Sequence, residues 1–346
     1  MINRWHTRLI VVMLLASVSV VSADNPEDGI SRGGAEARDV INRLSDSIFR
    51  FNIRTRTLGG KQFWTDYLVR HDWRIQRNEV TNHYRLLDDR NYRHHWGTFS
   101  QCRKALDYLV KREKLPEVTG TVVLLLHGLG RTRSSMDELQ EYLQKQSGST
   151  VISLSYASTR ASLDQHARAL QSVLKNIPHA KQVQLVGHSL GNLVIRRYLK
   201  SADKTDARIH RIVMLAPPNQ GSSLATLFKD NHLFQIFWGE SGEELADDWQ
   251  GLMQQLATPA CEFGIIAGGN LKSPFDNPLI KGNDDLVLRV AETRLAGARD
   301  FTVVQSYHGR LMKDPQAMSC TLRFLRHGHF ISDEKRQPIS DGGAGS

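Results

Sequence analysis

Cysteine is scarce in this chain, and its few copies form no recognisable metal-binding pattern. Cys102, Cys261 and Cys320 lie far apart in a sequence of 346 residues. Structural zinc sites need closely spaced ligand pairs, and none of these spacings provides one. At most one disulfide can form among three cysteines, and the sequence does not say which pair would form it. We therefore expect no metal site.

Long apolar runs are also lacking beyond the N-terminus. The run at residues 9–21 is 13 residues long, which is too short to cross a bilayer comfortably. It follows Arg4 and Arg8 and precedes Val21-Ser22-Ala23, whose compact residues are typical of a cleavage site. This pattern predicts a secretory signal peptide at residues 1–23 and an exported protein, periplasmic or secreted. The alternative is an uncleaved N-terminal anchor.

No helix-borne stripe of basic residues is present, although the chain is basic overall. The formal net charge is +9, from 45 Lys and Arg against 36 Asp and Glu. The basic residues are scattered rather than clustered, which argues against a nucleic-acid-binding protein. The positive excess is compatible with transient contact with an anionic lipid surface. There are no internal repeats.

What the chain does contain is a regular alternation of apolar strands and amphipathic helices from about residue 120 onward. Strands are predicted at 121–126, 150–156, 182–186, 211–216, 263–267 and 301–307, with a capping box at Ser135–Glu138 opening one of the helices. Strands that alternate with helices indicate a parallel sheet. The predicted fold class is α/β, a doubly wound and mostly parallel sheet flanked by helices.

The most informative motif follows the strand at 182–186. Gly187-His188-Ser189-Leu190-Gly191 has the form G-x-S-x-G between a strand and a helix. In this context the motif predicts a sharp turn that presents the serine hydroxyl at the C-terminal edge of a sheet. Ser189 is the expected nucleophile. His188 inside the turn is expected to be structural, with its side chain pointing away from the reaction face of the nucleophile.

A serine nucleophile needs a base and an orienting carboxylate. His308 comes directly after the last predicted strand and would reach the same sheet edge as Ser189. The acid is expected in the interval before that strand, where Asp284 and Asp285 are adjacent. Only one of them can face the imidazole, and we prefer Asp284 while keeping Asp285 as the alternative.

The tetrahedral intermediate needs two backbone N–H donors. One is expected from Leu190, the residue after the nucleophile. The other is expected from the loop after the first core strand, His127-Gly128-Leu129-Gly130, where Leu129 is the candidate. Its glycines would let the backbone fold closely around the oxyanion.

These motifs resemble those of α/β-hydrolases of the bacterial lipase and esterase group. The resemblance is carried by the segments 127–130, 187–191, 218–222 and 283–287 together with His308, and it covers roughly residues 119–328. In that group the acid motif commonly runs Asn-Asp-Gly-x-Val. Matching it implies Asp284 as the acid and puts Asp285 where glycine is usual. The resemblance implies hydrolysis of ester or lipid substrates and no organic cofactor.

The remaining segments complete the expected organisation. Residues 24–118 form an N-terminal extension with an antiparallel hairpin, 74–78 against 83–87, at a sheet edge, and residues 119–330 form the catalytic domain. The aromatic-rich segment 227–256 is either a lid over the site or an ordinary helix buried in the core. Residues 331–346 are expected to be a disordered tail.

The leading interpretation is a serine carboxylic-ester hydrolase that acts through an acyl-enzyme. An acyltransferase would use the same residues, with another alcohol in place of water, so the sequence does not separate the two. A non-catalytic lipid- or protein-binding module on the same fold is the alternative of another class.

Overall fold

The computed structural model describes residues 54–57, 62–201, 206–220, 249–269 and 283–340. The chain divides into two compact units, 1–51 and 52–346, and every described residue belongs to the second. The predicted signal peptide at 1–23 and residues 227–248 of the predicted lid lie outside the described residues.

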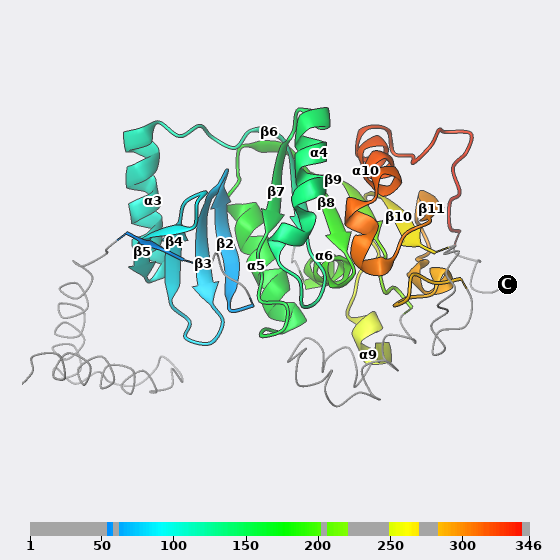
Figure 1. Cartoon of the computed structure of the whole chain (residues 1–346), viewed down its shortest axis with the longest axis horizontal. Helices are drawn as coiled ribbons and strands as arrows, with labels where there is room; N and C mark the ends of the chain where they lie inside the picture. Colours follow the sequence, from blue (N-terminus) through cyan, green and yellow to red (C-terminus); the bar gives the residue numbers. More distant parts are fainter. Residues whose placement is uncertain (1–53, 58–61, 202–205, 221–248, 270–282, 341–346) are drawn as a thin grey trace, which may run out of the picture. The chain divides into compact units, whose positions relative to one another are not determined.

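The central feature is a six-stranded sheet in the order β11-β10-β9-β8-β6-β7, in which every neighbouring pair is parallel. Figure 1 shows it in green to orange. This arrangement confirms the predicted fold class. The strands are β6 (Gly120–Leu126), β7 (Thr150–Leu154), β8 (Ala180–His188), β9 (Ile209–Leu215), β10 (Glu262–Gly268) and β11 (Asp300–Val304).

Helices cover both faces of this sheet because its strands are apolar on both sides. Along β6, Val122, Leu124 and Leu126 belong to one buried cluster, whereas Val123 and Leu125 belong to another. The first cluster includes residues of α5 (Leu163–Lys175) and α6 (Leu190–Ser201). The second includes residues of α4 (Asp137–Ser147) and α10 (Pro315–His327). Continuous burial of this kind is the pattern of a doubly wound parallel sheet.

A second, antiparallel sheet precedes the parallel one. Its order is β1-β5-β4-β3-β2, and helix α3 (Phe99–Glu113) packs against one face through a small apolar cluster. The predicted hairpin is confirmed, since β3 and β4 pair antiparallel, but it lies inside this sheet rather than at an edge. The strands are β1 (Thr55–Arg56), β2 (Trp64–Arg70), β3 (Trp73–Asn78), β4 (Tyr84–Leu87) and β5 (Tyr92–Gly97).

The two sheets meet where the edge strand β2 lies beside the end of β7. The backbone N–H of Asp66 donates to the carbonyl of Ser155 at 2.8 Å. The N–H of Ser155 donates in turn to the Asp66 carboxylate at 2.7 Å. The same carboxylate accepts from Arg74 at 2.7 Å, and both side chains are almost fully buried. Two hydrogen bonds between Asp66 and Ser155 therefore join the antiparallel sheet to the parallel one, and the buried ion pair with Arg74 holds the Asp66 carboxylate in place.

The C-terminal segment is more ordered than its composition suggests. The N–H of Gln337 donates to the Asp300 carboxylate at 2.9 Å, and Ile339 is buried and exchanges backbone hydrogen bonds with Gly297 and Ala298. The prediction of a disordered tail from residue 331 is therefore wrong for 331–340, because anchoring to Asp300 and burial of Ile339 offset the polar composition. Residues 341–346 lie outside the described part.

Short elements and the cysteines complete the description. The remaining helices are α9 (Trp249–Gln254) and three 3-10 turns, at Arg133–Met136, Val290–Thr293 and His308–Lys313. Cys102, Cys261 and Cys320 are all free thiols, and burial raises the pKa of Cys102 to about 12. Among the residues described, no helix has the length and apolar character needed to span a bilayer.

Candidate active site

Ser189 occupies a strained turn between strand β8 and helix α6. Its φ is +51°, in the left-handed region that residues with a Cβ seldom adopt. The turn is fixed on both sides, because the Ser189 N–H donates to the Leu215 carbonyl at 3.0 Å and its own carbonyl accepts from the Asn192 N–H at 3.0 Å. A strained serine directly before a helix is the geometry predicted for a nucleophile elbow.

The two glycines of the motif provide space rather than unusual dihedrals. A Cβ at Gly187 would lie 2.4 Å from the Asn192 amide oxygen. A Cβ at Gly191 would lie 2.4 Å from the Leu126 carbonyl oxygen of the neighbouring strand. Both positions therefore exclude any larger residue, while the positive φ falls on Ser189 itself.

His308 lies beyond the end of β11 and pairs with Asp285. The Nδ1 atom of His308 is 2.8 Å from Oδ2 of Asp285, whose side chain is fully buried. The His308 N–H also donates to the Asp285 carbonyl at 3.0 Å. The other carboxylate oxygen of Asp285 accepts the N–H groups of Val287 and Leu288. These contacts fix the carboxylate and, through it, the imidazole.

The preference for Asp284 as the residue beside His308 is wrong. Its carboxylate accepts the N–H of Leu286 at 2.7 Å, and its backbone forms an isolated bridge with Arg289. Asp285 therefore lies beside the imidazole, whereas the Asp284 carboxylate is held in its own local turn.

His188 lies against His308 instead of pointing away from the site. The two rings are 4.9 Å apart between centroids, and Nε2 of His188 is 3.0 Å from the His308 carbonyl oxygen. Because a carbonyl only accepts, His188 carries its proton on Nε2. Burial and the nearby His308 hold the pKa of His188 well below its usual value. His188 is thus a neutral residue that supports the position of His308.

The loop after β6 passes directly beside the nucleophile. A Cβ at Gly128 would lie 3.3 Å from the Ser189 Cβ and 2.9 Å from Nδ1 of His188. Leu129 follows in this loop, and Leu190 is the first residue of α6. Within the described residues, neither the Leu129 N–H nor the Leu190 N–H donates to another group. Both predicted oxyanion donors are therefore near Ser189 and unoccupied by the rest of the described chain.

No hydrogen bond joins the Ser189 hydroxyl to His308 within the described part of the chain. The structure brings Ser189 and His308 together at the same end of the parallel sheet, with His188 contacting His308 from the position before the serine. Catalytic contacts in ligand-free structures are often long and shorten when substrate binds.

Two further buried histidines lie behind the loop. His127 stacks on Tyr156 with 4.0 Å between ring centroids, and the Tyr156 hydroxyl donates to the His127 carbonyl. His166 also contacts Tyr156, with 4.8 Å between ring centroids. Burial lowers the pKa of His127 to about 4 and that of His166 to about 3. Both are neutral near pH 7, so they support the loop without competing for the serine proton.

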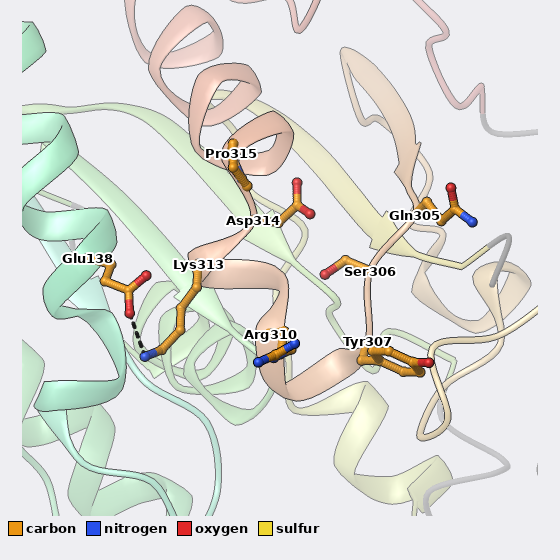
Figure 2. Close-up of a pocket in the computed structure, with 8 residues that line it drawn as sticks. All are labelled: Glu138, Gln305, Ser306, Tyr307, Arg310, Lys313, Asp314 and Pro315. Carbon is orange, nitrogen blue, oxygen red and sulfur yellow. Dashed lines mark hydrogen bonds and ion pairs between the residues drawn. The ribbon is translucent and has the colours of Figure 1, made fainter. Parts of the chain in front are cut away.

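A polar cavity of about 600 Å³ is lined by residues close to His308 in sequence (Figure 2). Tyr307 and Arg310 line it together with the ion pair between Lys313 and Glu138. Ser189, His308 and Asp285 are not part of its lining. The cavity is therefore separate from the cluster formed by these three residues.

Among the described residues, no group of three or more His, Cys, Asp and Glu side chains is placed to hold a metal ion. The arrangement that the structure does provide is a strained serine, a histidine held by a buried carboxylate, and two unoccupied N–H groups. These are the components of nucleophilic acyl transfer.

The sequence predicted that Ser189, His308 and the loop after β6 lie at one edge of the sheet, but it missed the contact of His188 and favoured Asp284, whereas Asp285 is the residue beside His308. The sequence held one usable signal for the acid. Asp285 is followed three residues later by Leu288, which is fully buried, just as Asp284 is followed by Val287. The acid motif can therefore be matched in either of two registers. Nothing in the sequence indicated which way the His188 ring would point.

The parallel sheet and the elbow after its strand β8 are arranged as in the α/β-hydrolase fold. A family model described as a domain of unknown function (DUF7379) matches residues 87–239. No curated protein matches the chain.

Several solved structures are similar to the chain at low sequence identity. The phospholipase PlaB from Legionella pneumophila, solved with thio-NAD, is 22% identical, with a TM-score of 0.42 over 50% of this chain and 44% of PlaB. The mature lipase BlEst2 from Bacillus licheniformis is 16% identical, with a TM-score of 0.47 over 61% of this chain and 93% of the lipase. A malate-bound esterase from Thermogutta terrifontis is 16% identical, with a TM-score of 0.42 over 62% and 92%. This chain therefore spans less than half the length of PlaB.

Proposed function

We propose that this protein is a serine hydrolase of carboxylic esters. Ser189 is the nucleophile, His308 is the base and Asp285 orients the imidazole. The observation that carries the proposal is the 2.8 Å contact between His308 and the fully buried Asp285 carboxylate, at the sheet edge where the elbow presents Ser189. A serine hydroxyl reacts only when a positioned base removes its proton, and this pair supplies such a base.

In the first half of the reaction, Oγ of Ser189 attacks the ester carbonyl carbon while Nε2 of His308 takes the serine proton. The negative charge that develops on the carbonyl oxygen is stabilised by the N–H groups of Leu129 and Leu190. The intermediate then collapses, the bond to the alcohol breaks, and the alcohol leaves with the proton from His308. The acyl group remains on Ser189.

In the second half, water attacks the acyl-enzyme while His308 takes one of its protons. Collapse of the second intermediate releases the carboxylic acid and returns the proton to Ser189. Nδ1 of His308 keeps its hydrogen bond to Asp285 through both halves, so the carboxylate stabilises the imidazolium that forms twice per cycle.

The decisive experiment uses nitrophenyl esters with acyl chains of two to sixteen carbons, with and without added short alcohols. The wild-type protein should release nitrophenol and carboxylic acid, and a fluorophosphonate probe should label Ser189. Ser189→Ala should lose about 10⁶ in turnover and all labelling while keeping its fold. A folded wild-type protein that neither turns over any ester nor reacts with the probe would exclude the proposal. Dominant transfer of the acyl group to the added alcohol would instead identify an acyltransferase.

A further inference from the structure

Gln62 connects the antiparallel sheet to the loop that carries the candidate oxyanion donor. It lies two residues before β2, at the edge of that sheet. Its Nε2 donates to the Arg131 carbonyl at 2.6 Å, at the end of the loop after β6. Its Oε1 accepts from the Thr159 N–H at 3.2 Å and from the Ser158 hydroxyl at 3.2 Å, in the segment after β7. One amide side chain therefore joins three separate segments.

Ser158 extends this connection into the loop. Its hydroxyl oxygen accepts from the Gly130 N–H at 3.0 Å while the hydroxyl donates to Gln62, and the side chain is completely buried. A hydroxyl has one proton to donate, so the directions of the two bonds are fixed. Gly130 is in turn held in the left-handed region, with φ of +65°. Two hydrogen bonds therefore connect Gln62 through Ser158 to Gly130.

These contacts leave Leu129 restrained on both sides. On one side, Gly128 is packed against Ser189 and His188. On the other side, Gly130 is held by Ser158 and the Arg131 carbonyl is held by Gln62. An N–H donor stabilises an oxyanion only when it is already aimed at the position where the charge develops. The direction of the Leu129 N–H is therefore set by the bonds on both flanks of that residue.

The backbone of Gln62 shows that its place is imposed by the surroundings. Its φ is +48°, a region unfavourable for a residue with a Cβ. Such a conformation persists only where neighbouring contacts determine it, and such residues cluster at functional sites. Here the determining contacts are the bonds of its side-chain amide to Arg131, Ser158 and Thr159.

We propose that Gln62 is a positioning residue for the oxyanion hole, and that the antiparallel sheet contributes to the active site through it. The inference rests on the proposed ester hydrolysis and adds a role for a segment well before the elbow in sequence. Gln62 does not touch the reacting atoms. It acts through Ser158 and the loop, so its loss should weaken stabilisation of the transition state more than binding of the substrate.

The test compares Gln62→Ala, Ser158→Ala and the double variant on one nitrophenyl ester. We expect each single change to lower kcat by about 10- to 100-fold, less than complete loss of an oxyanion donor, with KM changed by less than about twofold. The inhibition constant of phenylboronic acid, which forms a tetrahedral adduct with a catalytic serine, should rise by a similar factor. Because the two side chains act through the same series of hydrogen bonds, the kcat of the double variant should be no lower than that of the slower single variant.

Gln62→Glu serves as a second variant should Gln62→Ala not fold. It keeps the oxygen that accepts from Ser158 and Thr159, removes the donor to the Arg131 carbonyl, and places a charged oxygen beside that carbonyl. We expect a change in the same direction, a lower kcat at nearly constant KM. The matched control is Gln101→Ala. Gln101 also binds backbone, at the cap of helix α3, so its loss should lower thermal stability without changing kcat or boronate inhibition.

Three outcomes would overturn this inference while leaving the proposed function intact. The first is a Gln62→Ala enzyme that resembles Gln101→Ala, less stable but with normal kcat and boronate affinity. The second is a raised KM with normal kcat, which would place Gln62 in substrate binding. The third is multiplicative losses in the double variant, which would separate Gln62 from Ser158. An inactive wild-type enzyme, by contrast, would exclude the proposed function and this inference with it.

Discussion

Hydrogen bonds to neighbouring residues hold Ser189 in its strained backbone conformation. A left-handed φ at a serine is unfavourable by roughly 1–2 kcal/mol. The hydrogen bonds of its N–H to Leu215 and of its carbonyl to Asn192 offset this cost. The Asn192 side chain donates further bonds to the Ser189 and Leu215 carbonyls. The elbow is therefore held by the strand and helix around it rather than by the serine itself.

At the same scale, Asp285→Asn should lower turnover by about 10⁴, because an amide cannot hold His308 in the tautomer that accepts the serine proton. Asp284→Asn is the matched control, since among the described residues its carboxylate accepts only the Leu286 N–H, and an amide oxygen can replace it there. The measurement is kcat for both purified variants, with thermal melts to confirm folding. A larger loss for Asp284→Asn would assign the acid role to the other residue.

The sequence could not choose between these two aspartates for a physical reason. Both carboxylates accept a backbone N–H two residues later, so both positions favour the same local turn. The choice depends on the direction of the chain as it leaves β10. There a Cβ at Gly268 would lie 2.8 Å from the Asp285 Cβ, so the carboxylate is packed over the end of that strand. That is a tertiary contact, and no local pattern encodes it.

Among the elements, the buried strands were the most predictable. All six strands of the parallel sheet appear where apolar runs predicted them, because strands covered on both faces need continuous apolar sequence. The ends of strands and helices were less predictable. The last strand was expected to reach residue 307 but ends at Val304. Helix α4 begins without a side-chain cap, because a 3-10 turn precedes it where a capping box was predicted.

The antiparallel sheet was only partly predicted, because one of its faces is polar and buried. Gln76 is fully buried, donates to Asp66 at 2.8 Å and accepts from Arg85 at 2.8 Å. Arg85 also covers the ring of Trp64, with its guanidinium carbon 3.7 Å from the ring centroid. Burial of paired polar groups does not appear as an apolar pattern in the sequence. A hairpin was therefore visible, whereas the complete sheet was not.

Also at the scale of elements, Gly191→Ala should separate α6 from β6. The new Cβ would meet the Leu126 carbonyl oxygen, a backbone atom that cannot rotate away, so the helix start must shift. Overpacking of this kind costs roughly 1–3 kcal/mol of unfolding free energy, and the shift should also lower kcat because it moves Leu190. Urea denaturation and ester turnover measure the two effects.

The control for that variant is Gly309→Ala. A Cβ there would meet only the end of the flexible Arg131 side chain, which can move aside. We expect its unfolding free energy to stay within about 0.5 kcal/mol of wild type. If Gly191→Ala is equally stable, the contact between the elbow and β6 is looser than the structure indicates.

For the whole molecule, the buried histidines make stability depend on pH. His127, His166 and His188 have pKa values lowered by burial, to about 4 for His127 and about 3 for His166. In the unfolded chain each would titrate near pH ~6.5. Between about pH 6.5 and 4 the unfolded state therefore binds more protons, and the unfolding free energy falls as pH falls, by up to about 1.4 kcal/mol per pH unit for each histidine.

The measurement is urea denaturation at pH 7 and pH 5. We expect a clear loss of stability at pH 5 and a smaller loss in His166→Gln, which has one fewer group to protonate. The exposed His179 provides the control, because His179→Gln removes no buried histidine. Equal unfolding free energies at the two pH values in the wild-type protein would contradict the assignment of these histidines as neutral and buried.

The junction of the two sheets contains a buried polar cluster around Asp66. Asp66 accepts hydrogen bonds from Arg74, Gln76 and the Ser155 N–H, and the Arg74 side chain is only 3% exposed. Asp66→Asn would leave the Arg74 charge buried without a compensating carboxylate, which typically costs about 3–5 kcal/mol of unfolding free energy.

Asp107→Asn is the control, since its pair with Arg103 is half exposed and should contribute less than about 1 kcal/mol. Denaturant unfolding would measure both. Because Gln62 lies two residues before β2, the Asp66 variant should also lose turnover at temperatures where it remains folded. An Asp66→Asn protein as stable and as active as the Asp107 control would show that the two sheets are held together elsewhere.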